Sequence, residues 1–304
     1  RRRHTRYWRD WSSDVCSSDL FKALLNFDQF WVASEWQKEM AIEQGYPAEK
    51  VKVVPEAVDS KKYFPLESRP TNEKKKFLIF GRWEYRKSTK EMIENWVEAF
   101  KDIDDVELIV SVDNPYSIDK MNTTEERLEF YGIPTDKIKI LHFPSNEDYI
   151  NLLQTGDVFL SCSRAEGWNL PLIESMACGT PSFYSDWSGQ LEFAKGRGIP
   201  VKISKLLPAM VGEGKMYTQS PIAGDYCEPD WDDFKEKLID VYNNLISSLS
   251  LAQQNNPKIQ EKYLKISRHL INLKNKSKLL DLEDLEDYTD LKKTYKKEID
   301  NNVS

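Results

Sequence analysis

The chain contains little cysteine, little histidine and no long apolar run. Its 304 residues include four cysteines and three histidines. The cysteines after residue 20 are widely spaced and odd in number, which excludes a disulfide framework and a cysteine zinc site. No window holds the roughly 20 apolar residues that cross a bilayer, and no segment reads as a secretory signal. We therefore expect a cytoplasmic protein from a reducing compartment.

An excess of positive charge is also missing. The formal net charge is −7, and the first twenty residues contribute five arginines and three aspartates, which leaves −9 for the rest. A nucleic-acid partner would need a basic face. The composition therefore argues against nucleic acid as a partner, while the apolar content of 40% is enough for a real core.

The first twenty residues resemble translated sequencing adapter. The run WSSDVCSSDL, from Trp11 to Leu20, is the translation of a common short-read adapter, and Arg1–Arg6 match an upstream run. The alternative is a basic N-terminal arm that binds nucleic acid or membrane, which the codon match disfavours. We set residues 1–20 aside as one does an expression tag, and we expect the natural protein to begin before Phe21.

The rest of the chain divides into three parts. Residues 21–70 read as the end of an N-terminal domain followed by a crossover. Residues 71–250 form the main domain. Residues 251–304 are rich in Lys, Glu and Asp, and are either a solvated helical tail or a partly disordered one.

The crossover region contains two predicted strands, a helix and a linker. Short β-like runs occupy 30–33 and 51–54, and between them Ser34 caps a helix that has Gln37 at the capping-box position. Residues 66–76 are polar with a basic run, so they read as a linker.

Short apolar strands alternate with helices through the main domain. Near-continuous apolar strands separated by helices predict a parallel sheet covered on both faces. Right-handed crossovers then give a doubly wound, Rossmann-like α/β fold. The expected strands are 77–80, 106–112, 138–143, 158–161 and 181–184. The expected helices are 88–100, 123–131, 146–154, 170–178 and 231–249.

A basic loop follows the first of these strands. Gly81 lets the chain turn sharply out of the sheet, and Arg82 can fork onto phosphate oxygens. Lys87 adds a mobile positive charge, and the following helix N-terminus adds a partial one. The loop therefore suits a phosphate group. The alternative is an ordinary basic loop with Arg86 and Lys87 in solvent.

A second motif follows the strand 158–161. Glu166 lies in a loop, whereas Glu174 lies inside a helix whose first turn holds Pro171. Carboxylates accept paired hydrogen bonds from vicinal hydroxyls, so each Glu suits a ribose or hexose diol. The alternative is a helix N-terminus at which the dipole stabilises two glutamates.

Backbone between these glutamates also suits a ligand. Gly167 allows close approach, and free N–H groups at Asn169 and Leu170 point where an anion or a sugar hydroxyl would sit. Both motifs fall at the carboxyl ends of parallel strands, where open α/β sheets bind ligands.

Four stretches together resemble one family. The spacing Glu166-x7-Glu174 in SRAEGWNLPLIESMACGTP resembles the E-x7-E signature of retaining glycosyltransferase family 4, also called group 1. VASEWQKEMAIEQGYPAEKVKVVPEAVDSKKYFP resembles that family's crossover, FGRWEYRKST its phosphate loop, and ILHFPSNEDYINLLQTGDVFLSCS the segment before the signature. The resemblance covers about residues 28–235. It implies the C-terminal, donor-binding half of a GT-B fold.

The resemblance implies roles for single residues. Arg82 and Lys87 would hold the donor diphosphate, Glu166 would act at the transferred sugar, and Glu174 would take the ribose hydroxyls. The donor would also be contacted by Gly81, Gly167, Trp168, Asn169, Leu170, and by His142 and Phe143 in the loop for the base. Such enzymes use no DXD-bound metal, so we expect no metal and no cofactor, and electrostatic stabilisation of the leaving diphosphate.

The implied activity is transfer of a hexose, with retention, from a nucleotide-diphosphate sugar to a glycan, lipid or other small acceptor. The N-terminal domain would supply the acceptor site and any membrane association. Because only its last helix is expected here, this chain alone would bind the donor without turnover. The alternatives are a nucleotide-sugar-binding module without catalysis, and another GT-B enzyme such as a sugar-nucleotide epimerase.

Some positions depart from the family pattern. Asn169 stands where Gly is commonest, and Ser88 replaces the Gly that usually ends the basic loop. The second departure leaves open whether Arg86 or Lys87 fills the lysine's role. His142 and His269 do not match the family's acceptor-side histidine.

Overall fold

The computed structural model describes residues 27–116, 120–208 and 225–254, with side chains to residue 245. Those up to Leu245 belong to one compact unit. The adapter-like segment and the tail beyond residue 254 lie outside the described residues. Within the described residues, no helix has both the length and the apolar character that crossing a bilayer requires.

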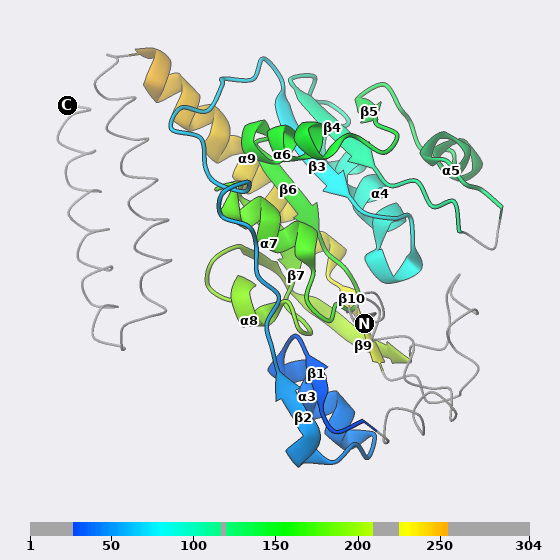
Figure 1. Ribbon diagram of the computed structural model, residues 1–304. Coiled ribbons are helices and arrows are strands. Elements are labelled where there is room, and N and C mark those ends of the chain that lie inside the picture. The colour runs from blue at the N-terminus through cyan, green and yellow to red at the C-terminus, as the bar shows by residue number, and fades with distance from the viewer. Residues whose placement is uncertain (1–26, 117–119, 209–224, 255–304) are drawn as a thin grey trace. The chain divides into compact units, whose positions relative to one another are not determined.

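A parallel sheet forms the centre of the described chain (Figure 1). Its six strands run in the order β5-β4-β3-β6-β7-β8. The chain moves outward from β3 to β5 and then returns to place β6 beside β3, where Phe77 pairs with Val158 and Leu78 with Phe159. This order confirms the expected doubly wound α/β fold. The strands are β3 Lys75–Phe80, β4 Val106–Ser111, β5 Ile138–Ile140, β6 Val158–Ser161, β7 Ser182–Ser185 and β8 Ile199–Val201.

Helices cover both faces of this sheet. Successive side chains of β3 point to opposite faces, so neighbouring residues pack against different helices. Phe77 packs in a cluster with Trp96 of α4 and Phe234 of α9. Leu78 packs in a second cluster with Leu172 of α7. Burying each such side chain contributes roughly 2 kcal/mol. The helices are α4 Thr89–Ala99, α5 Thr124–Tyr131, α6 Asn146–Thr155, α7 Leu170–Ala177, α8 Leu191–Ala194 and α9 Trp231–Gln254.

The crossover region forms a small parallel pair of strands, β1 (Phe30–Val32) and β2 (Val51–Val53), with α3 (Glu35–Glu43) between them. The predicted cap is confirmed, since the Ser34 hydroxyl accepts from Gln37 N. The Gln37 side chain accepts from Ala33 N at 2.7 Å. Gln37 therefore binds the backbone N–H of Ala33. In a capping box it would bind the N–H of the cap residue, Ser34.

Several elements differ from the sequence prediction: β5 ends at Ile140 instead of residue 143, and α8 and β8 were not expected. Strand β3 begins at Lys75, inside the stretch predicted as a linker, because its backbone pairs with β4 and the Asp157 carboxylate accepts from Lys76 N. Strands β9 (Ile203–Pro208) and β10 (Asp225–Pro229) form an antiparallel pair that the sequence analysis missed. Most of β9 is exposed, so its apolar signal is weak.

Arg69 anchors the predicted linker to the domain. Its guanidinium donates to the carbonyl of Gln154 at 2.9 Å, to that of Gly156 at 2.8 Å, and to the Thr180 hydroxyl at 2.6 Å. The two carbonyls lie at the C-terminal end of α6, where helix carbonyls lack intrahelical partners. The side chain therefore joins this helix end to the turn that precedes β7.

We predict that Arg69→Met lowers the free energy of unfolding by about 2 kcal/mol, because charge-assisted hydrogen bonds to buried carbonyls are lost. Arg69→Lys should recover only a small part, since an ammonium cannot reproduce the guanidinium fork. Urea unfolding followed by circular dichroism measures both. Arg197→Met is the control, because that arginine donates to one carbonyl, Phe193 O at 3.1 Å. Equal losses in both Met variants would contradict the anchoring role.

Candidate functional site

The two predicted motifs meet at the middle of the sheet's carboxyl edge. The connections that follow β3 and β6 leave in opposite directions, and doubly wound sheets bind ligands at this switch point. The loop after β3 begins at Gly81, and the loop after β6 contains Glu166. A concave surface between them is lined by residues of both loops and strands, including Gly81, Arg82, Lys87, Thr89, Ser161 and Ser163.

The basic loop leaves the sheet through backbone geometry that favours small residues. Gly81 has a φ of +149°, and its N–H still donates to Ser111 O. A 3₁₀ turn over Tyr85–Lys87 follows, and Ser88 then enters α4 in the left-handed region, with a φ of +51°. Gly adopts this left-handed backbone without strain, whereas Ser88 adopts it at some cost. Arg82 remains partly exposed, with its Nε 3.3 Å from Glu84 Oε1.

Glu166 is buried against two cations of that loop. Its Oε2 lies 3.0 Å from Arg86 Nη1, and its Oε1 accepts a hydrogen bond from Lys87 Nζ. Only 3% of Glu166 is exposed, and Arg86 is buried as well. The alternative of a basic loop with both side chains in solvent is therefore wrong. The pairing of Arg86 with Glu166 was not foreseen.

These contacts determine the ionisation of Glu166. Burial by itself raises the pKa of its carboxyl. The positive charges of Lys87 and Arg86 outweigh that effect and lower the pKa to about 2. A buried carboxylate persists only where opposite charges and hydrogen bonds compensate for lost hydration. Glu166 is therefore a fixed negative charge at neutral pH.

The loop after β7 holds the backbone of Glu166. Its N–H donates to Ser188 Oγ at 3.0 Å, and its carbonyl accepts from Gly189 N at 2.9 Å. A Cβ on Gly189 would lie 2.1 Å from Gly167 O, so no larger residue fits there. A Cβ on Gly167 would in turn lie 2.3 Å from the Gln37 side-chain nitrogen. A side chain at position 167 would therefore collide with α3, and the approach of a ligand to the Gly167 backbone stays a prediction.

The residues between the two glutamates are largely internal. Asn169 precedes α7 with a φ of +79°, a conformation that Asn tolerates best after Gly. Its amide donates to Ser161 Oγ at 2.9 Å and to Gln190 Oε1 at 2.8 Å, so it ties the loop to β6 instead of capping the helix. Trp168 packs on Phe193 in the core. Leu170 is the first residue of α7, as predicted.

Glu174 lies within α7 and is held by phenols. Tyr149 Oη donates to Glu174 Oε2 at 2.7 Å. Burial, together with the charge and hydrogen bond of Glu174, raises the pKa of Tyr63 to about 12 and that of Tyr149 still further. Both hydroxyls therefore stay protonated and serve Glu174 as neutral donors.

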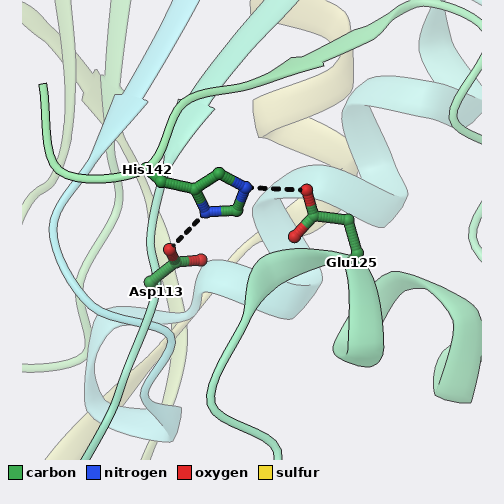
Figure 2. A group of neighbouring side chains, drawn as sticks. All are labelled: Asp113, Glu125 and His142. Atoms are coloured by element: carbon green, nitrogen blue, oxygen red, sulfur yellow. Dashed lines mark hydrogen bonds and ion pairs between the residues drawn. The ribbon is translucent and has the colours of Figure 1, made fainter.

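His142 joins two carboxylates after the end of β5. Figure 2 shows the imidazole between Asp113 and Glu125. Its Nδ1 lies 2.7 Å from Asp113 Oδ2, and its Nε2 lies 3.0 Å from Glu125 Oε1. Thr124 donates to Asp113 through both its backbone N and its hydroxyl. Phe143 follows His142 with 68% exposure and a φ of +43°.

This cluster fits a protonated histidine. The three side chains place one ligand atom each within 4.8 Å of one another, which is close enough for a shared cation. Each ring nitrogen, however, faces a different carboxylate, and only an imidazolium donates from both. Hydrogen bonding to Asp113 raises the pKa of His142, although burial opposes it. Burial raises the pKa of Asp113, but hydrogen bonds from Thr124 and His142 lower it overall.

We predict that His142 titrates above the ordinary histidine pKa of about 6.5. Its contribution to stability should be full below about pH 6.5 and should decline as the pH rises through the raised value. Proton NMR measures the titration, with the resonance assigned by its loss in His142→Gln. Asp113→Asn should lower the pKa more than Glu125→Gln, because Asp113 is the more buried partner. A His142 pKa at or below about 6.5 would contradict the ion-pair description.

The strand order and the convergence of loops at its switch point define the class: a doubly wound α/β domain of the kind found in GT-B glycosyltransferases. Residues 63–198 match the model of the family described as glycosyl transferases group 1.

Relatives of known name agree with this class. The chain is 26% identical over 158 residues to a component of the phosphatidylinositol N-acetylglucosaminyltransferase of Arabidopsis thaliana, a match that covers 52% of this chain and 34% of the plant protein. The chain thus spans about a third of that relative's length.

Solved structures resemble the chain in fold. A glycosyltransferase from Rickettsia africae superimposes with a TM-score of 0.57 at 14% identity, covering 84% of this chain and 62% of that one. Anabaena HepE, solved with UDP and glucose, gives a TM-score of 0.50 at 18% identity and covers 61% and 54%. At these identities the likeness establishes the fold.

Proposed function

We propose that this domain binds the nucleoside-diphosphate part of a sugar donor, within a protein that transfers a hexose with retention. One observation carries the proposal: at the switch point, the cationic loop after β3 meets the carboxylate loop after β6, with Lys87 and Arg86 both on Glu166. A binding surface for a donor needs cations for phosphate and acceptors for sugar hydroxyls, and these loops supply both.

The comparisons support the same class of substrate. The family matched over residues 63–198 is one of glycosyl transferases, and the plant relative is named for transfer of N-acetylglucosamine. HepE was solved with UDP and glucose. We therefore propose a nucleotide-diphosphate sugar as donor and a glycan, lipid or other small molecule as acceptor.

The site residues take roles that follow from their chemistry. Arg82 and Lys87 would hold the diphosphate, aided by the N-terminus of α4. Glu166 would accept hydrogen bonds from the transferred sugar, and Glu174 from the ribose. The loop of His142 and Phe143 would meet the base.

The chemistry proposed is electrostatic. Arg82, Lys87 and the helix dipole of α4 would stabilise the charge that develops on the leaving diphosphate. The acceptor would attack from the face that the diphosphate leaves, and a phosphate oxygen would take its proton, so configuration is retained. In this scheme donor binding requires no metal ion.

We predict that UDP or GDP binds this chain with heat measurable by calorimetry, and that excess EDTA leaves the Kd unchanged. Glu174→Ala should weaken binding about tenfold, because the ribose hydroxyls lose a charged acceptor. Tyr149→Phe should weaken it less, because it leaves the carboxylate in place. Glu147→Ala, on the exposed start of α6, is the matched control and should bind as the wild type does.

Circular dichroism confirms folding in each case. No heat with either nucleotide from a folded wild-type chain would refute the proposed donor site. Equal binding by wild type and Glu174→Ala would remove Glu174 from it.

A further inference from the structure

The two groups that the proposed function assigns to different parts of the donor are bonded to each other. Lys87 Nζ donates to Glu166 Oε1, yet Lys87 is the proposed diphosphate ligand and Glu166 the proposed sugar ligand. A donor that uses both residues must therefore either share the Lys87 ammonium with Glu166 or draw it away from that carboxylate.

The two cations on Glu166 differ in freedom. Arg86 is 8% exposed, donates to Ala165 O at 3.0 Å, and lies 3.4 Å from Glu84. The Lys87 side chain is 20% exposed, and it borders the concave surface at the switch point. A lysine ammonium on a flexible stem can change partner, whereas a guanidinium fixed by several acceptors stays in place.

Glu166 itself cannot follow the lysine. Its backbone is fixed on both sides by Ser188 and Gly189, and its other oxygen is held by Arg86. Movement of Lys87 toward a phosphate therefore leaves a buried carboxylate with one cation fewer. Removing one partner from a buried ion pair is costly unless another donor replaces it.

We propose that Glu166 competes with the bound diphosphate for Lys87, so that the site favours an intact sugar donor over the bare nucleoside diphosphate. This inference rests on the proposed function. When the sugar is present, its hydroxyls donate to Glu166 in place of Lys87, and the ammonium is free for the phosphate. Without the sugar, the phosphate and Glu166 share the single charge of Lys87, which weakens its attraction to each of them. The product diphosphate is then held less tightly, and Glu166 assists its release.

Arg86 makes this exchange possible. It keeps one positive charge on Glu166 while Lys87 is away, so the carboxylate remains ionised and in position. Arg86 is therefore a positioning residue in this scheme, while Arg82 and Lys87 face the phosphate.

The test is calorimetry of Glu166→Gln with UDP and UDP-glucose, and with GDP and GDP-mannose. The variant should bind the bare diphosphate about three- to tenfold more tightly than the wild type, the range expected for releasing a partly exposed ion pair. Its affinity for the sugar nucleotide should not increase. Asp233→Asn is the matched control, because Asp233 is also a buried carboxylate paired with two lysines, Lys202 and Lys237.

Each outcome has one meaning. If the folded wild type binds no nucleotide, the proposed function fails. If the wild type binds UDP or GDP but folded Glu166→Gln binds it equally or less tightly, or Asp233→Asn gains as much, the competition is refuted and the proposed function stands.

A measurement on the wild type decides the matter even if Glu166→Gln does not fold. The ¹⁵N resonance of the Lys87 ammonium, assigned by its loss in Lys87→Arg, should shift further on saturation with the sugar nucleotide than on saturation with the bare diphosphate, because the sugar releases Lys87 from Glu166. An equal or smaller shift with the sugar nucleotide would overturn the exchange of partners.

Discussion

The site depends on the pairing of β3 with β6. Two strands far apart in the chain become neighbours when Phe77 pairs with Val158, and neighbouring strands lie about 4.8 Å apart. Their exit loops therefore begin side by side and diverge, which produces the concave surface between them. The contact continues beyond the sheet, where Arg164 N donates to Arg86 O at 2.7 Å. The geometry of the charged groups is thus an extension of the strand pairing.

A buried arginine stabilises that extension. Arg164 Nη1 donates to Tyr85 O at 2.6 Å, while the same guanidinium pairs with Glu91 and Glu228 and lies 3.9 Å from the centre of the Tyr85 ring. It fixes the 3₁₀ turn that presents Arg86 and Lys87 to Glu166. Arg164 thereby connects α4 and β10 to the loop after β6. The loop proposed to bind phosphate is therefore held in shape by the Arg164 guanidinium.

The features that could be predicted from the sequence are those that a local residue pattern determines. Strands such as β3 and β6 were found because they are short continuous apolar runs, and the loop and helix positions of Glu166 and Glu174 followed from Pro171. The partners of those glutamates could not be predicted, because Arg86 and Tyr149 reach them only through the tertiary fold. The pair β9–β10 was not predicted for a different reason: β9 is largely exposed, so its sequence contains little apolar pattern.

The two glutamates have partners of different kinds, so the two ends of the proposed donor should bind through different interactions. Glu174 is bonded to phenols, so a ribose diol would replace neutral hydroxyls with neutral hydroxyls, an exchange that salt affects little. Glu166 is bonded to cations, so recruiting Lys87 to a phosphate changes the charge balance of a buried group. Lys87 is partly exposed, so its attraction to a phosphate is screened by salt. The phosphate end should therefore govern the salt dependence of binding, while the ribose end contributes affinity that is largely independent of salt.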